Sequence, residues 1–277
     1  MSEFADRVAI VTGGGGGIGL ALAERLAQQG ARVVIAEIDA ASLEKAASRI
    51  AGAGGAVRAR RVDVSDLAAV QELVAEVAAA EGRIDYLFNS AGTMFSGEIQ
   101  EMDSAQWERI VAVNLWGTIH AIRAAYPRMI EQRSGHLVNI ASATGLTPAP
   151  LGGAYAMTKH AVVGLSLSLR EEAAALGVRV SVACPGFIDT GIFDAAMHGR
   201  HGGRWLLGRV PFRPYPAERA ARSILRGVER NRATIILPLH AHVLVWGSRL
   251  VPGLMRRLAQ GNLRRYRATS PGRDSHR

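Results

Sequence analysis

The sequence predicts an α/β fold with a doubly wound parallel sheet of about seven strands, formed as a single domain with a C-terminal extension. Two observations lead to this prediction. Short apolar runs alternate with longer amphipathic stretches six times, as in strand–helix–strand units with right-handed crossovers. Glycine-rich and polar segments follow these runs directly, at the edge where open α/β sheets bind ligands. The 277 residues suffice for one large domain with a full core.

Each expected element is a short apolar run or a longer stretch with one apolar face. We expect strands at residues 7–12, 31–36, 57–62, 84–89, 135–141, 178–183 and 233–238. We expect helices at residues 20–29, 40–51, 66–81, 104–130, 154–173 and 216–230. Because the two kinds of element alternate, the carboxyl ends of the parallel strands should meet at one edge.

The first expected strand leads into a glycine-rich turn at residues 13–19, which precedes a helical pattern. Backbone N–H groups at such a helix N-terminus point outward, and the helix dipole favours a bound pyrophosphate. Glycines let a phosphate approach the backbone and let the helix pack close to the strand. A flexible linker is the alternative, but a linker would not be framed by a buried strand and an amphipathic helix.

Glu37 follows the second expected strand, 20 residues after Gly17. A carboxylate at this distance can bind the ribose hydroxyls of NAD and would repel the 2′-phosphate of NADP. No arginine or lysine lies within residues 13–19 or directly after Glu37. The sequence therefore favours NAD over NADP, although an isolated acid at a strand end is also commonly just solvated.

Two further strand ends carry residues that suit a bound nucleotide. Asp63 and Val64 follow the third expected strand, where a carboxylate can accept a hydrogen bond from an adenine amino group. The fourth strand ends in residues 89–92, Asn-Ser-Ala-Gly, whose small side chains let the backbone approach a ligand.

Tyr155 and Lys159 lie four residues apart, so they project from one face of the expected helix 154–173. A free tyrosine has a pKa near ~10, and a neighbouring ammonium group lowers it by favouring the phenolate. Such a phenol can take a proton from an alcohol or return it to a ketone oxygen. Ser142 follows the fifth expected strand and can hydrogen-bond the same oxygen. Taken alone, the four-residue spacing would more often be an accident of a helix surface.

Asn114 lies among apolar neighbours inside the expected helix 104–130. Its amide needs hydrogen-bond partners there. Asn114 is therefore either a satisfied structural residue or part of a proton path, and the sequence favours neither.

Together these motifs resemble those of the short-chain dehydrogenase/reductase family. The resemblance runs from about Arg7 to Pro238 and includes a TGxxxGxG pattern that begins at Thr12 and an NxAG pattern that begins at Asn89. It implies a Rossmann-type fold, hydride transfer to or from NAD(P), and a homodimer or homotetramer. The implied catalytic residues are Asn114, Ser142, Tyr155 and Lys159. The implied cofactor-binding residues are Gly13, Gly17, Ile18, Gly19, Glu37, Asp63, Val64, Asn89, Ala91, Gly92, Tyr155, Lys159, Pro185, Gly186, Ile188 and Thr190.

The resemblance also implies a role for each catalytic residue. Ser142 would orient the substrate oxygen, and Tyr155 would exchange a proton with it. Lys159 would lower the pKa of Tyr155 and contact the nicotinamide ribose. Asn114 would hold a water that passes the proton onward, and Thr190 would contact the carboxamide of the nicotinamide.

The substrate pocket of such a fold would be built from residues 94–96, 146–153, 187 and 191–213. The apolar members of these segments predict a hydrophobic secondary alcohol or ketone. Those members are Met94, Phe95, Leu146, Pro148, Leu151, Phe187, Ile192, Phe193, Met197 and Trp205. Residues 198–204 are rich in glycine and charge, which suits either a lid or a variable loop. The histidines here and at 240 and 242 have no carboxylate or cysteine at ligand spacing, so no metal site is expected.

We expect residues 1–239 to form a dinucleotide-binding catalytic domain and residues 240–277 a basic, partly amphipathic extension. Of 33 basic residues, 17 follow residue 197, against three of the 24 acidic ones. Residues 240–260 suggest a helix pair broken at Pro252-Gly253, and residues 264–277 a disordered tail. The pair would lie on an anionic membrane surface, or cover the substrate pocket or a subunit interface. No recognition motif for nucleic acid accompanies the arginines.

The cysteine content and the hydropathy of the sequence argue against several broad classes of protein. The single cysteine, Cys184, permits no internal disulfide, which suits a reducing cytoplasm. It lies in an apolar run, which predicts a buried side chain. The N-terminus does not resemble a signal peptide, and no apolar run is long enough to span a membrane. The function alternatives are an NADP-dependent carbonyl reductase and a non-catalytic dinucleotide-binding sensor or membrane-associated protein.

Overall fold

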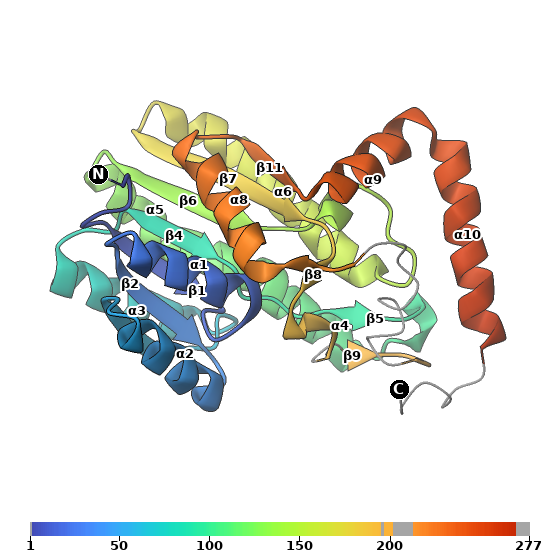
Figure 1. The fold of residues 1–277 in the computed structure, drawn as a ribbon, viewed down its shortest axis with the longest axis horizontal. Coiled ribbons are helices and arrows are strands. Elements are labelled where there is room, and N and C mark those ends of the chain that lie inside the picture. Colours follow the sequence, from blue (N-terminus) through green and yellow to red (C-terminus); the bar gives the residue numbers. More distant parts are fainter. Residues whose placement is uncertain (1, 195–196, 202–212, 270–277) are drawn as a thin grey trace.

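A computed structural model describes residues 2–194, 197–201 and 213–269 (Figure 1). Its centre is a parallel sheet with the strand order β11-β7-β6-β4-β1-β2-β3. The strands are β1 (Val8–Thr12), β2 (Arg32–Glu37), β3 (Val57–Arg61), β4 (Tyr86–Asn89), β6 (Gly135–Ile140), β7 (Val178–Pro185) and β11 (Thr234–Leu237). The direction of winding reverses at β1, between β4 and β2, which opens a crevice at the carboxyl edge of the sheet. The predicted doubly wound fold is confirmed.

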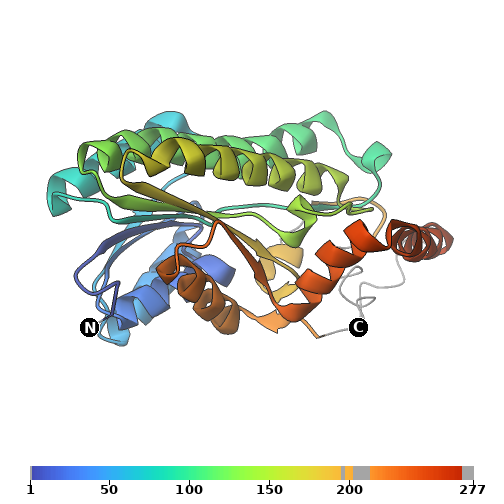
Figure 2. The ribbon, with the colours of Figure 1, turned by 90° about the horizontal axis from the view of Figure 1, so that it is seen from above.

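Helices cover both faces of this sheet, as Figure 2 shows in the view from above. One layer contains α1 (Gly17–Gln28), α2 (Ala40–Gly52) and α8 (Ala217–Glu229), and the other α3 (Leu67–Glu81), α5 (Gly117–Glu131) and α6 (Gly153–Ala174). Side chains of β1 alternate between the layers, because Ala9 and Val11 pack under α1 while Val8 and Ile10 pack towards α3 and α5. This burial on both faces explains why the strands are continuous apolar runs in the sequence.

One predicted helix has a different local structure. The expected helix 104–130 consists of α4 (Ser104–Val111), a π-helical turn over Ala112–Trp116, and α5. Such turns occur mostly as single insertions within α-helices, frequently at functional sites. This one contains Asn114.

Short parallel strand pairs bring the loops of the carboxyl edge together. β5 (Phe95–Ser96) pairs with β9 (Met197–His198), and β8 (Ile188–Asp189) pairs with β10 (Tyr215–Pro216). Segments from the middle and the last third of the chain therefore border one region beyond the sheet.

The C-terminal extension forms two helices, α9 (Leu239–Leu250) and α10 (Pro252–Ala268), which meet at the predicted break. The predicted disorder of residues 264–277 is wrong for residues 264–268, which belong to α10, while residues 270–277 lie outside the described part. Tyr266 is buried there, and its hydroxyl donates to Glu101 Oε2 at 2.5 Å. Arg267 donates to Glu98 Oε1 at 2.6 and 3.0 Å. In the described ranges, no helix has both the length and the apolar character needed to cross a bilayer.

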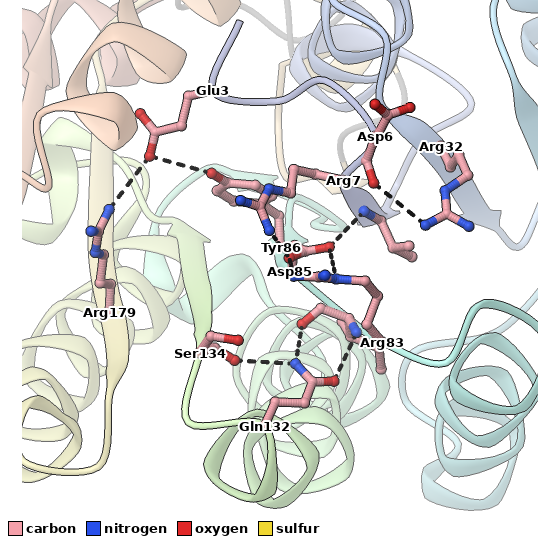
Figure 3. A network of polar contacts seen from close by, with 12 residues as sticks. Glu3, Asp6, Arg7, Arg32, Arg83, Asp85, Tyr86, Gln132, Ser134 and Arg179 are labelled. Carbon is pink, nitrogen blue, oxygen red and sulfur yellow. Dashed lines mark hydrogen bonds and ion pairs between the residues drawn. The ribbon is translucent and has the colours of Figure 1, made fainter.

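A polar network joins the amino ends of the strands, at the edge opposite the crevice (Figure 3). Asp85 is buried and accepts hydrogen bonds from Val8 N, Arg7 and Arg83. Gln132 binds both backbone groups of Ile84, which fixes the end of α5 to the start of β4. These ion pairs therefore lie at the opposite edge of the sheet from the predicted catalytic and cofactor-binding residues.

Candidate active site

A cavity of about 1260 Å³ follows the carboxyl edge of the sheet, from the glycine-rich turn to α10. All of the predicted site residues line it except Asn89 and Asn114, which lie behind its wall. Six strand ends, far apart in the sequence, thus contribute to one space. This convergence follows from the parallel topology, because every strand ends at the same edge.

The glycine-rich turn has no room for side chains on its inner side. A Cβ atom on Gly19 would lie 2.1 Å from Gly13 O, and one on Gly13 would lie 2.7 Å from Ala91 Cα. Gly13 and Gly17 also adopt φ angles of +65° and +53°, which favour glycine. A Cβ on Gly16 would meet nothing within 4 Å. The turn is thus tight against the sheet and open towards the cavity, at the N-terminus of α1, which fits a pyrophosphate group.

Glu37 ends β2 and lines the cavity beside this turn. Its carboxylate accepts hydrogen bonds from Gly15 N at 3.3 Å and from Ile38 N at 2.8 Å. Arg61 pairs with Glu37 in the register of β3 and β2, and its Nε donates to Ile38 O at 3.0 Å. The sheet register therefore brings a basic residue near Glu37 that inspection of sequence neighbours did not find.

Asp63 lines the neighbouring part of the cavity, together with Val64. Burial raises the pKa of Asp63, but hydrogen bonds from Ser65 and Arg109 outweigh burial, so that the pKa lies below its usual value. Arg109 Nη1 lies 3.2 Å from Asp63 Oδ2. The carboxylate is therefore held ionised at this end of the cavity.

The loop after β4 is fixed by polar side chains from neighbouring strands. Thr12 Oγ1 accepts hydrogen bonds from Ser90 N at 3.1 Å and Ala91 N at 3.2 Å. Asn89 Nδ2 donates to Asn139 Oδ1 at 2.8 Å, behind the cavity wall. Sequence reasoning missed the supporting role of Thr12 and Asn139, although polar residues inside buried apolar strands were a visible signal.

Ser142, Tyr155 and Lys159 come together where β6 ends and α6 begins. Lys159 Nζ donates to Ile140 O at 2.9 Å and lies 5.5 Å from the centre of the Tyr155 ring. The Ser142 hydroxyl accepts a hydrogen bond from Thr144 N at 3.2 Å, and its proximity to Tyr155 favours the phenolate and lowers the tyrosine pKa. Tyr155 packs with Met94 and Phe193, and a Cβ on Gly92 would lie 3.6 Å from Lys159 Nζ. The tyrosine therefore borders an apolar compartment, while the lysine borders the loop after β4.

The expected direction of the tyrosine pKa is wrong for this arrangement. Burial raises the pKa of Tyr155 to about 12, although the nearby Ser142 hydroxyl acts in the opposite direction. Burial also lowers the pKa of Lys159 to about 8. The ammonium lies over the ring and is bonded to a backbone carbonyl, so its attraction for a phenolate does not offset the loss of water around the phenol.

Asn114 is fully buried in the π-helical turn, and both ends of its amide are bonded. Oδ1 accepts from Thr93 N at 2.7 Å, and Nδ2 donates to Thr93 O at 2.9 Å and Thr158 Oγ1 at 3.1 Å. A Cβ on Gly92 would lie 3.4 Å from Asn114 Oδ1. Asn114 thus fastens the loop after β4 to α6, and a role in passing protons stays a prediction.

The loop after β7 closes the other side of the cavity. The side chain of Thr190 lies 3.2 Å from the position of a Cβ on Gly17, so this loop reaches the glycine-rich turn. Phe187 N is hydrogen-bonded to His240 Nε2 at 3.1 Å, which ties the loop to α9. Pro185, Gly186 and Ile188 line the cavity between these two contacts.

The apolar end of the cavity differs in part from the expected substrate pocket. Met94, Pro148, Leu151, Phe187, Ile192 and Phe193 line it. Phe95, Leu146 and Met197 instead pack in hydrophobic clusters of the core. Trp205 and residues 202–204 of the expected lid lie outside the described residues. The inner faces of α9 and α10 add a wall that was not assigned residue by residue from the sequence. Its members include Leu244, Ser248, Met255, Arg256, Leu258, Ala259, Asn262 and Leu263.

Comparison with known proteins gives consistent matches. The family profile described as short chain dehydrogenase matches residues 7–200. An uncharacterized oxidoreductase of Staphylococcus saprophyticus is 42% identical over 191 residues, covering 69% of this chain and 82% of that protein. A Burkholderia phymatum short chain dehydrogenase/reductase, solved with NAD, has a TM-score of 0.81 and 31% identity, covering 98% of both chains. A metagenomic short-chain oxidoreductase, solved with NADP, has a TM-score of 0.70 and 30% identity, covering 85% of this chain and 98% of that one.

Proposed function

This chain belongs to the short-chain dehydrogenase/reductase family of NAD(P)-dependent oxidoreductases, and from that premise we propose that it interconverts a hydrophobic secondary alcohol and its ketone with NAD as the cofactor. One observation carries the proposal. Tyr155 borders both parts of a single cavity, the apolar compartment around Met94 and Phe193 and, through Lys159, the side that adjoins the glycine-rich turn. A substrate carbon and a nicotinamide held in these two parts would meet beside the phenol.

The residues at this point suit proton exchange with a substrate oxygen. A bound nicotinamide supplies the redox chemistry by accepting or giving up a hydride. Ser142 orients the substrate oxygen, and Tyr155 gives it a proton during ketone reduction or removes one during alcohol oxidation. The raised pKa of Tyr155 keeps the phenol protonated at neutral pH, which favours its action as an acid on a ketone.

NAD is supported by the position of Glu37. Its carboxylate lines the cavity against Gly15, where the adenosine ribose would lie and where a 2′-phosphate would be repelled. Arg61 keeps NADP as a second candidate, because its guanidinium lies beside Ile38 at the same corner. The Burkholderia relative was solved with NAD and the metagenomic one with NADP, so relatives of both kinds exist.

Calorimetric titration with NADH and with NADPH tests the cofactor. We expect tighter binding of NADH, and Glu37→Ala should reduce that preference by roughly tenfold. Tighter binding of NADPH by the unaltered protein would instead support the NADP-dependent carbonyl reductase. Binding of neither would contradict the dinucleotide site.

A panel of apolar secondary alcohols and ketones tests the reaction. Tyr155→Phe should lose turnover by roughly 10²–10⁴-fold while keeping its affinity for NADH. NADH binding without turnover of any alcohol or ketone would favour the non-catalytic sensor. A homodimer or homotetramer and a cytoplasmic location stay predictions.

A further inference from the structure

The exposed surface of α9, α10 and the residue between them, Val251, carries an unusual concentration of apolar side chains. We call it the C-terminal apolar face, and its members are Leu239, Val243, Trp246, Leu250, Val251, Leu254 and Leu258. They are 48 to 79% exposed and make up seven of the 13 large apolar residues that are exposed in the described ranges. A concentration of exposed apolar side chains of this kind indicates an interaction site.

The helical periodicity shows that covering the cavity does not account for the exposed side chains of α9. Leu239, Val243, Trp246 and Leu250 recur every three to four residues and form one stripe of α9. The opposite stripe contains Ala241 and Val245, which are buried, and Leu244 and Ser248, which line the cavity. α9 therefore has two apolar stripes, of which only the inner one packs on the domain.

The charge of this region has one sign. α9 and α10 contain six arginines and no aspartate or glutamate. Arg267 pairs with Glu98. In the part of the chain that the structure describes, the other five form no ion pair. They are Arg249, Arg256, Arg257, Arg264 and Arg265.

These charges favour a lipid surface over a second copy of the chain. A twofold interface through the C-terminal apolar face would bring the arginines of one copy towards those of the other, without carboxylates on either helix to pair with them. An anionic bilayer complements both features, because apolar side chains enter the interfacial region while guanidinium groups meet phosphates. Tryptophan, here Trp246 with Arg249 over its ring at 5.8 Å, is enriched at that depth.

The helices are also joined to the domain at both ends of the pair. In Figure 1, α9 and α10 project from the edge of the domain, and Figure 2 shows them beyond the carboxyl ends of the strands. His240 joins the start of α9 to the loop after β7, and Tyr266 and Arg267 join the end of α10 to Glu101 and Glu98. The face is thus presented by anchored helices.

We propose that the C-terminal apolar face is a docking surface for a bilayer of anionic phospholipids, on which α9 and α10 lie in the interfacial plane. This interaction goes beyond the proposed function and does not require it. If the proposed function also holds, docking places the cavity near the bilayer, because Leu258 is 57% exposed and also lines the cavity. An apolar alcohol or ketone dissolved in lipid would then enter beside α10.

The test is co-sedimentation of the full chain with two kinds of vesicle, phosphatidylcholine alone and phosphatidylcholine mixed with phosphatidylglycerol. We expect strong binding to the anionic vesicles, weaker binding to the neutral ones, and a loss of binding as salt rises. The emission of Trp246 should shift to shorter wavelength on binding, as judged by comparison with Trp246→Phe.

Matched substitutions separate a specific face from general adhesion. The pair Trp246→Ser and Leu250→Ser should weaken binding to anionic vesicles by roughly tenfold or more. The control pair Leu167→Ser and Leu176→Ser, exposed leucines elsewhere on the surface, should bind like the unaltered chain. Arg257→Gln and Arg264→Gln should each weaken binding by about fivefold, whereas Arg222→Gln on α8 should not.

Three outcomes would overturn the proposal. The first is that the unaltered chain does not bind anionic vesicles. The second is that the leucine control pair weakens vesicle binding as much as the Trp246 and Leu250 pair does. The third is that the unaltered chain binds no vesicles but forms a dimer, which the Trp246 and Leu250 variant does not form. The last outcome would assign the face to a second copy. NADH titration of each variant shows that the domain is folded, and it keeps a failure of docking distinct from a failure of the proposed function.

Discussion

At Tyr155, burial and the nearby Ser142 hydroxyl act on the pKa in opposite directions, and burial is the larger effect. Ketone reduction needs the protonated phenol, so its rate should change little between about pH 6 and pH 7, below the pKa of about 8 at which Lys159 loses its charge. Alcohol oxidation needs the phenol to have lost its proton, so its rate should rise by up to about tenfold per pH unit over the same range. Turnover in both directions against pH measures this, and an oxidation rate that levels off below pH 7 would contradict it.

His136 is a second buried titratable residue, away from the cavity. Burial lowers its pKa to about 3, and its Nε2 lies 2.9 Å from Ser181 Oγ. Below the ordinary histidine pKa of ~6.5, the unfolded chain binds a proton that the folded chain excludes. The folded state therefore becomes less stable as the pH is lowered.

The free energy of unfolding should therefore decrease by up to ~1.4 kcal/mol per pH unit from about pH 6.5 downward because of His136. His136→Gln should remove this part of the slope. Urea unfolding of both proteins at several pH values is the measurement, and identical slopes would show that His136 is already protonated in the folded state.

At the scale of elements, two glycines in the turn between β1 and α1 differ in the space available for a side chain. Gly19→Ala would place a methyl group 2.1 Å from Gly13 O, which forces the turn open, whereas Gly16→Ala meets nothing within 4 Å. We expect Gly19→Ala to lose NADH binding by roughly a hundredfold or more and Gly16→Ala to lose less than about tenfold. Calorimetry of both variants decides, and equal losses would contradict this geometry.

The same scale shows what could be predicted from the sequence. Residues directly after strands, such as Glu37 and Ser142, were placed correctly because parallel strands share one carboxyl edge. Arg61 was missed because its position beside Ile38 depends on the register of β2 and β3, which a single sequence does not reveal. The π-helical turn at Asn114 was missed because one inserted residue leaves helical periodicity nearly unchanged.

The direction of the Tyr155 pKa was mispredicted for a related reason. Spacing on a helix places Lys159 near the ring, but it does not say how far both groups are removed from water. The sequence did not decide whether α9 and α10 cover the substrate pocket, a subunit interface or a membrane surface. Which face of an apolar helix turns inward depends on the whole tertiary structure.

At the scale of the whole molecule, α10 is joined to the domain mainly near its two ends, which should allow it to open separately. Tyr266 is 1% exposed and packs with Leu151 and Leu263. Tyr266→Ala should raise the trypsin cleavage rate within α10 by roughly 10- to 100-fold and raise KM for apolar substrates, with little effect on NADH affinity.

Limited proteolysis alongside thermal unfolding measures this separation, because the midpoint of unfolding should shift much less than the cleavage rate. Tyr126→Ala on α5 is a control, as a half-buried tyrosine away from the C-terminal helices. If it accelerates cleavage of α10 equally, α10 opens only with the whole domain.

The single cysteine has a practical consequence for labelling. Cys184 is fully buried, and burial raises its pKa to about 12, so the thiol stays protonated at pH 7. The unaltered chain should consume no thiol reagent until it is denatured, and a thiol titration in both states checks this. A new cysteine such as Arg265→Cys would then accept one dye at one place, without removal of the native residue. Energy transfer between that dye and a nitrobenzoxadiazole-labelled vesicle would report the distance of α10 from a lipid surface in a protein whose interior chemistry is untouched.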